Sequence, residues 1–392
     1  MGNRLPIVFV HGLLGWGQRK VWGLPYFGLA WLGVGLGRLA ELDFAPSERA
    51  LFPSVGPISS DHDRACELFY QLKGGDVHYG EAHAREHGHS AVVPHWRKGK
   101  RPLYPVWDEA HPLHFVGQAQ GACTVRRLQH LLAQGDFFLN PTTGKPYPTS
   151  AKWVFSLASI SAIFNGTPAV YVLGCSPEDG RAERFSMAAY LGHTAFGLES
   201  EPGRLWRFID RQIYSFDLAQ WRGVTQFISG TDNAAYDLSI HGAQAADYLE
   251  DFDCTYYLSY LTSLTRKEPE PGHFIPKPGM NPFFRYVGEE LGCFAGPLQN
   301  LKYPITDFSP WRENDGLAPV YTQDYPKWGR PRRFEKSAAG VSLKRGVWNV
   351  MDTLEMDHMN TVALPRLTRS LRQPLEQIRF YKCLYQRLAN LE

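Results

Sequence analysis

The chain has 392 residues, with 41 basic and 39 acidic side chains and a net charge of +2. Because the basic residues form no concentrated stretch, nucleic acid is not an expected partner. Hydrophobic residues make up 44% of the sequence, enough for a large core, and α/β chains of this length often form one domain. The six cysteines are widely scattered, so they predict neither a dense disulfide framework nor a C-x-x-C zinc site.

The N-terminal segment begins with a predicted strand. Residues 5–10 are apolar and rich in β-branched side chains, and they end in His11-Gly12, a pattern typical of a buried central strand. No signal peptide is visible before it, which fits either a cytoplasmic protein or a secreted one whose leader has been removed. The next apolar stretch, residues 21–39, is interrupted by Pro25 and several glycines. We therefore expect core or pocket wall there rather than a transmembrane segment.

A short strand, a glycine-flanked turn and a helix are predicted in succession between residues 112 and 132. The turn reads Gly-Gln-Ala-Gln-Gly over residues 117–121. This is the context of the nucleophile elbow Gly-x-Ser-x-Gly, in which a strained turn exposes a serine oxygen. Ala119 occupies the serine position and has no oxygen to offer. On this pentapeptide alone, a glycine-rich turn without chemistry explains the pattern equally well.

Further strand and helix patterns alternate along the chain. Strands are expected over residues 153–157, 255–261 and 347–348, and helices over residues 63–72, 243–249 and 371–391. This alternation predicts an α/β fold, with a mostly parallel central sheet covered by helices on both faces. Residues 163–225 fit the alternation poorly, and we interpret them as an inserted helical lid or cap within a single domain of residues 1–392.

Polar motifs elsewhere complete a constellation typical of an enzyme. The loop of residues 11–17 follows the first strand, and such a loop supplies one backbone N–H, here that of Leu13, to an oxyanion hole. The residue after the nucleophile, Gln120, supplies the other N–H. Asp315 in a polar turn and then His358 follow in the chain order of an α/β-hydrolase: nucleophile, acid, histidine. In that scheme His358 is the general base and Asp315 fixes its tautomer.

Several blocks of the sequence resemble the large zinc-containing bacterial true lipases of the Bacillus and Staphylococcus type. The matching blocks keep their order and span almost the whole chain: residues 6–17, 55–66, 71–89, 236–239, 313–316 and 344–358. The resemblance implies an α/β-hydrolase fold with a helical lid, and ester hydrolysis through an acyl-enzyme. It implies Ala119 at the nucleophile position, Asp315 as the acid and His358 as the base. Family members usually carry a histidine before the serine, and we expect Gln118 to change the pocket more than the mechanism.

Two short clusters contain candidate metal ligands. Unaided spacing favours His83 and His87, an i,i+4 pair on one helical face. The resemblance implies a different set: Asp63, His83, His89 and Asp237. Because a glycine follows His87, we expect the helix to end there and the chain to turn His89 back. Two carboxylates and two imidazoles make a closed set of four ligands, as a structural zinc prefers.

A second metal, calcium, is not expected. The lipases of this family carry calcium near the catalytic histidine, held by acidic side chains a few residues beyond it. This chain has Asn360 and Pro365 where carboxylates would be needed. Calcium requires charged oxygen ligands, so we do not expect it to bind here.

The alanine at position 119 leaves several interpretations open. Because the flanking glycines, the acid and the base are all present, one interpretation is a hydrolase whose serine is replaced by alanine. Another is a native Ala119 in a pocket that binds a ligand, or that promotes a reaction needing no nucleophile. A tailoring acyltransferase, lactonase or cyclase with the same triad is a further alternative. The aromatic content of 14% suits a small ester or a lipid-like apolar substrate, and the sequence does not indicate the oligomeric state.

Overall fold

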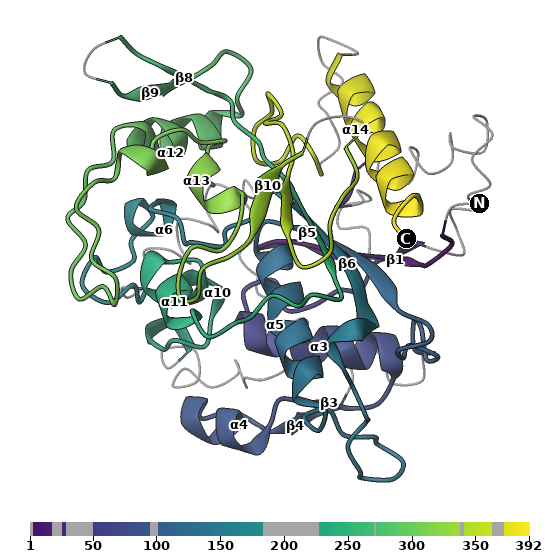
Figure 1. The fold of residues 1–392 in the computed structure, drawn as a ribbon. Coiled ribbons are helices and arrows are strands. Elements are labelled where there is room, and N and C mark those ends of the chain that lie inside the picture. Colours follow the sequence, from purple (N-terminus) through teal and green to yellow (C-terminus); the bar gives the residue numbers. More distant parts are fainter. Residues whose placement is uncertain are drawn as a thin grey trace, which may run out of the picture.

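The computed structural model describes residues 3–17, 26–28, 50–94, 101–182, 227–269, 272–337, 341–362 and 372–392 (Figure 1). Most of the predicted lid, residues 183–225, and most of the apolar stretch of residues 21–39 lie outside these ranges. Within the described ranges, no helix combines the length and the apolar character that a membrane span requires.

A parallel sheet forms the centre of the described structure. Its seven strands lie in the order β10-β11-β7-β6-β5-β1-β2, and every neighbouring pair is parallel. The strands are β1 (Ile7–Val10), β2 (Ala50–Leu51), β5 (Leu113–Gln118), β6 (Val154–Ile160), β7 (Tyr256–Tyr260), β10 (Phe334–Lys336) and β11 (Trp348–Val350). The predicted parallel sheet is confirmed, although the hydrophobic pattern does not predict the short edge strands β2 and β10.

Helices flank the sheet, and two small antiparallel sheets accompany it. The longer helices are α3 (Asp61–Lys73), α5 (Gln120–Gln134), α12 (Pro282–Gly292) and α14 (Arg372–Ala389). The shorter helical segments are α4 (Glu81–His87), η2 (Ala151–Trp153), α6 (Ala169–Val172), α10 (Ala234–Asp237), α11 (Ile240–Ala245), η3 (Ser309–Trp311) and α13 (Val320–Gln323). The small sheets pair β3 (Val77–His78) with β4 (Val92–Val93), and β8 (Thr265–Lys267) with β9 (Phe274–Pro276). The boundaries predicted for α11 are wrong, because the Ser239 side chain caps this helix and starts it earlier.

Side chains of the central strands alternate between two cores. Val8 and Val10 of β1 pack in the core that includes the apolar faces of α3 and α5. Ile7 and Phe9 pack in the opposite core, which includes Tyr381 of α14. Figure 1 shows α14 on one side of the sheet and α3 and α5 on the other. Helices therefore cover both faces, as the alternation of strands and helices predicts.

The carboxyl ends of the parallel strands meet at one edge of the sheet, where α/β proteins build their sites. There β1 leads into the loop of residues 11–17, and β5 leads into Ala119. The segment after β7 carries Thr262, and the segment after β11 carries His358. The strand order thus brings distant parts of the sequence to the same edge.

Candidate active site and metal centre

Ala119 lies in a strained turn between β5 and α5. Its φ and ψ angles are 49° and −120°, a combination that residues other than glycine rarely adopt. A Cβ atom on Gly117 would lie 2.5 Å from the backbone nitrogen of Ala122. A Cβ atom on Gly121 would lie 2.1 Å from the carbonyl oxygen of Val10. Both positions therefore require glycine, and the turn has the tight geometry of a nucleophile elbow.

His358 and Asp315 form a buried pair. His358 Nδ1 lies 2.9 Å from Asp315 Oδ2. The hydroxyl of Thr262 donates to the same carboxylate oxygen over 2.7 Å. The backbone N–H groups of Leu317 and Ala318 donate to Asp315 Oδ1. Because a carboxylate only accepts, the neutral ring of His358 carries its proton on Nδ1, and Nε2 keeps the lone pair that a general base needs.

The loop after β1 lies against position 119. A Cβ atom on Gly12 would lie 3.1 Å from the Cβ of Ala119. His11 fixes this loop, since its Nδ1 donates to Gly12 O over 2.9 Å and its Nε2 accepts from Val55 N over 3.1 Å. Burial and the nearby Arg64 charge lower the pKa of His11 to about 3. The ring therefore stays neutral and can make both hydrogen bonds.

Two backbone donors remain available beside the turn. In the described residues, the N–H groups of Leu13 and Gln120 donate no hydrogen bond to the protein. The N–H of the next loop residue, Leu14, donates to Pro57 O over 2.8 Å. An oxyanion hole requires two such backbone N–H donors that the protein itself leaves available.

Four side chains converge near the start of α3, and their donor atoms all lie within 4.8 Å of one another: Asp63, His83, His89 and Asp232. His83 Nε2 is 3.2 Å from Asp63 Oδ1 and 3.3 Å from Asp232 Oδ1. His89 Nε2 is 3.3 Å from Asp232 Oδ2. Ligands about 2.0 Å from a tetrahedral zinc lie about 3.3 Å apart, so these distances match a site with four ligands.

The end of α4 brings the two histidines together. Gly88 ends this helix with a φ angle of 75°, and the N–H groups of Gly88 and His89 both donate to Ala84 O. This turn returns His89 toward His83, as expected from the glycine. The ring of His87 lies 4.6 Å from that of His83 and belongs outside the cluster. Spacing alone favours His83 and His87, but the ring nitrogens that converge belong to His83 and His89.

The donor set fits a divalent cation. Among the described residues, the buried Oδ2 atom of Asp63 has no hydrogen-bond partner. Burial and the neighbouring Asp232 carboxylate raise the pKa of Asp63. Two carboxylates whose oxygen atoms lie within 4.8 Å of each other repel each other. A divalent cation between them would remove that repulsion. The cluster is therefore compatible with a bound metal.

The cluster differs in one residue from the ligand set that the resemblance implies. Asp237 lies outside the cluster, where its Oδ2 accepts a hydrogen bond from Asp61 N over 2.6 Å. Asp232 takes its place, because an antiparallel bridge between Ser59 and Asn233 holds residue 232 beside the start of α3. Both aspartates belong to one short segment, so local spacing does not distinguish them. The signal that sequence reasoning missed is a carboxylate directly before the asparagine that caps α10.

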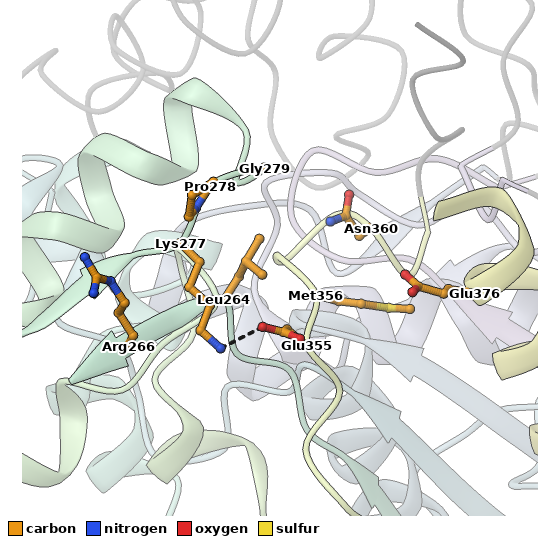
Figure 2. Close-up of a pocket in the computed structure, with 9 residues that line it drawn as sticks. All are labelled: Leu264, Arg266, Lys277, Pro278, Gly279, Glu355, Met356, Asn360 and Glu376. Carbon is orange, nitrogen blue, oxygen red and sulfur yellow. Dashed lines mark hydrogen bonds and ion pairs between the residues drawn. The ribbon is translucent and has the colours of Figure 1, made fainter. Parts of the chain in front are cut away.

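A pocket of about 430 Å³ borders the loop that carries His358 (Figure 2). Its polar lining consists of Arg266, Lys277, Glu355, Asn360 and Glu376. Figure 2 shows the ion pair in which Lys277 Nζ lies 2.7 Å from Glu355 Oε1. Asn360 stands where a calcium site would need a carboxylate, and it brings an uncharged amide to this pocket. Pro365, the second such position, lies outside the described residues. The Glu355 carboxylate is already neutralised by a lysine.

Comparisons of sequence relate the chain to lipases. A family model described as "Lipase-like, C-terminal domain" matches residues 3–142. The chain is homologous to the lipase of Staphylococcus hyicus, with 26% identity over 404 residues that cover 100% of this chain and 58% of that protein. It thus spans little more than half the length of the curated relatives that it matches.

Comparisons with solved structures agree with the comparisons of sequence. EstA from Clostridium botulinum aligns with a TM-score of 0.72 and 26% identity, covering 100% of this chain and 88% of that one. Lipase 1 from Pelosinus fermentans aligns with a TM-score of 0.72 and 25% identity, covering 100% of both chains. These alignments confirm the predicted α/β-hydrolase architecture with its parallel central sheet.

Proposed function

We propose that this homologue of the staphylococcal lipases is a serine-type carboxylic ester hydrolase whose nucleophile position is occupied by Ala119. The observation that carries the proposal is the buried pair of Asp315 and His358, at the same edge of the sheet as the strained turn. The available N–H groups of Leu13 and Gln120 support it as oxyanion donors. A turn that only connects a strand to a helix needs none of these groups.

With serine at position 119, each group has a role in ester hydrolysis. His358 Nε2 accepts the hydroxyl proton as the serine oxygen attacks the carbonyl carbon. The N–H groups of Leu13 and Gln120 stabilise the oxyanion, and Asp315 stabilises the imidazolium. His358 then protonates the leaving alcohol, and water releases the acyl group in a second step of the same kind.

The surroundings of position 119 support an apolar substrate. The Ala119 side chain belongs to a buried apolar cluster that also contains Ile163, Val170, Leu238 and Ala318. An acyl chain placed against such a wall gains about 25 cal/mol for each Å² of apolar surface removed from water. We therefore propose esters with apolar, lipid-like acyl groups as the substrate class.

The test is to restore the nucleophile with Ala119→Ser and to measure hydrolysis of p-nitrophenyl esters of several chain lengths. Removal of a nucleophile costs several powers of ten in rate, so we expect the restored chain to be at least ~10³-fold faster than the Ala119 chain. Ala235→Ser, which adds a hydroxyl to the same apolar cluster, is the matched control and should bring no gain.

A folded Ala119→Ser chain without increased activity would refute the hydrolase proposal. Tight binding of an apolar ligand, unaffected by His358→Ala, would then indicate a binding protein without catalysis. Transfer of the acyl group to an added alcohol in preference to water would instead indicate an acyltransferase that uses the same triad.

We also propose that the metal is a structural zinc held by Asp63, His83, His89 and Asp232. Four protein ligands leave no open position, so bound zinc would supply cross-linking and no chemistry to the substrate. The cross-link would join the start of α3, α4 and the segment before α10. Elemental analysis after extensive dialysis should find about one zinc per chain, and a chelator should lower the melting temperature. Absence of zinc, together with unchanged stability in chelator, would exclude this assignment.

A further inference from the structure

Gln118 is completely buried between the oxyanion loop (residues 11–17) and His358. Its Oε1 accepts a hydrogen bond from the Tyr26 hydroxyl over 2.6 Å, and Tyr26 in turn accepts one from Gly12 N over 3.1 Å. On its other side, Gln118 Nε2 lies 3.2 Å from the carbonyl oxygen of His358 and 3.3 Å from His358 Nε2. One side chain therefore connects the oxyanion loop to the proposed general base.

The direction of each hydrogen bond in this series is fixed. The carbonyl oxygen of His358 only accepts, so the amide nitrogen of Gln118 must face His358. The amide oxygen therefore faces Tyr26, whose single hydroxyl proton is donated to it. Burial raises the pKa of Tyr26, which keeps the phenol protonated. A reversed amide would place two acceptors face to face at His358, and that arrangement is unfavourable.

The same contacts select one tautomer of His358. Gln118 has two N–H hydrogens, enough for both the carbonyl oxygen and the ring nitrogen Nε2 of His358. A donor beside Nε2 is favourable only when that nitrogen carries a lone pair. Asp315 accepts from Nδ1 on the other side of the ring. Both neighbours thus favour the proton on Nδ1, which is the tautomer that a general base needs.

The carboxylate of Asp357, the residue directly before His358, makes its hydrogen bonds elsewhere and not with His358 Nε2. The Oδ2 atom of Asp357 accepts from Asn281 N over 3.1 Å. Its Oδ1 atom accepts from the backbone N–H groups of Met359 and Asn360. Asp357 is thus occupied by backbone donors, while Asp315 faces Nδ1. A charge introduced at position 118 would therefore act directly on Nε2.

We infer that Gln118 is a positioning residue, which holds His358 in the tautomer of a general base and ties it to the oxyanion loop. The inference rests on the proposed hydrolase function, and it replaces the expectation that Gln118 mainly reshapes the pocket. The contact of 3.3 Å between the two Nε2 atoms is longer than the best hydrogen bonds. A serine hydroxyl at position 119 can therefore take this lone pair, while the bond from Gln118 to the His358 carbonyl oxygen still holds the loop.

The tautomer can be measured without any hydrolysis. In ¹⁵N-histidine NMR of the unsubstituted chain, we expect His358 to show a protonated Nδ1 and an unprotonated Nε2. A spectrum with the proton on Nε2 would overturn the inference. If Ala119→Ser proves inactive, the proposed function fails, but this measurement still decides the arrangement around Gln118.

The activity test uses Gln118→Glu, which keeps the side-chain shape and replaces the donor by an acceptor. In the Ala119→Ser background, we expect the acid limb of the kcat/KM profile to move about one to three pH units higher, because a carboxylate beside Nε2 favours the protonated ring. Gln134→Glu adds the same charge at the exposed end of α5 and should leave the profile unchanged. A folded Gln118→Glu chain with an unmoved acid limb would contradict the inference.

A second variant covers the case in which the buried glutamate prevents folding. Tyr26→Phe removes the hydroxyl that joins Gln118 to the loop of residues 11–17, so that Gln118 Oε1 loses its donor and Gly12 N loses its acceptor. In the Ala119→Ser background, we expect kcat to fall about tenfold with little change in KM, because His358 and the loop of residues 11–17 are then held less firmly while no contact with the substrate is removed. Equal kcat values with and without the Tyr26 hydroxyl would speak against a positioning role.

Discussion

The proposed active-site region and the candidate metal cluster hold their polar groups by different means. Around Ala119, glycine packing and hydrogen bonds fix each group without a ligand: Asp315, for example, accepts from Thr262 and from two backbone N–H groups. In the cluster, Asp63 and Asp232 face the two imidazoles and each other, and burial together with the Asp232 charge raises the pKa of Asp63. The first region is organised before anything binds, whereas the second contains a repulsion that a cation would remove.

This difference predicts which substitutions change kcat and which change the free energy of unfolding. A polar group in the preorganised region contributes chiefly to the transition state, so its loss should change kcat more than the free energy of unfolding. A ligand in the metal cluster contributes binding energy that is also folding energy, so its loss should change stability more than kcat. Variants in the Ala119→Ser background test this contrast.

The largest effect is expected for Asp315→Asn. The amide that replaces the carboxylate can donate toward His358, which would favour the wrong tautomer, so kcat should fall by about 10⁴-fold. The melting temperature should change little in comparison. Asp307→Asn, an exposed neighbour in the same segment, serves as the control and should keep full activity. A rate loss below tenfold would mean that Asp315 is not the triad acid.

A smaller effect, on metal binding, is expected for Asp232→Asn. Loss of a charged ligand should weaken zinc binding at least ~100-fold and remove about 2.7 kcal/mol of the zinc-dependent stability. Asp237→Asn is the matched control, because Asp237 accepts from Asp61 N and lies outside the cluster. Zinc titrations followed by thermal unfolding would measure both variants. Loss of zinc in Asp237→Asn with retention in Asp232→Asn would show that Asp237, and not Asp232, is the ligand.

Local patterns predict the parts of these sites that depend on local geometry. Strand, glycine turn and helix follow one another in the sequence, so the turn at Ala119 can be predicted from the spacing of its glycines. The choice between Asp232 and Asp237 depends on a bridge from Ser59 to Asn233, which no local pattern shows. The contact of Gln118 with the Tyr26 hydroxyl also joins residues that are far apart in the sequence. Such tertiary contacts, and not motifs, decide which of several equivalent side chains faces a site.

The frame of the active-site region can be tested by Gly121→Ala. In a helix this change alone would stabilise by about 1 kcal/mol. Because the new Cβ would lie 2.1 Å from Val10 O, we expect instead a destabilisation. Overpacking of this kind costs about 1–3 kcal/mol. Ala133→Gly, at an exposed position of the same helix, measures the effect of helix propensity alone on the free energy of unfolding in denaturant. A stabilised Gly121→Ala chain would show that glycine packing does not hold the turn.

The smallest expected effect concerns His114, a buried polar group held like the active-site region, by hydrogen bonds and without an ion. Its ring contacts Ser156 Oγ at 2.6 Å and Asn3 Oδ1 at 2.9 Å, and burial lowers its pKa from 6.5 to about 3. Between these pH values the unfolded chain binds a proton that the folded chain excludes. Stability should therefore fall as the pH falls below 6.5, with a slope of up to about 1.4 kcal/mol per pH unit.

His114→Gln removes this titration, so its unfolding free energy should depend less steeply on pH between about 6 and 4.5. His111→Gln, an exposed residue just before β5, is the control and should keep the slope of the unsubstituted chain. If His114→Gln also keeps that slope, hydrogen bonds without an ion do not exclude the proton from a buried group. The idea that hydrogen bonds alone can hold a buried polar group in one protonation state would then fail, and with it that part of the contrast between the two regions.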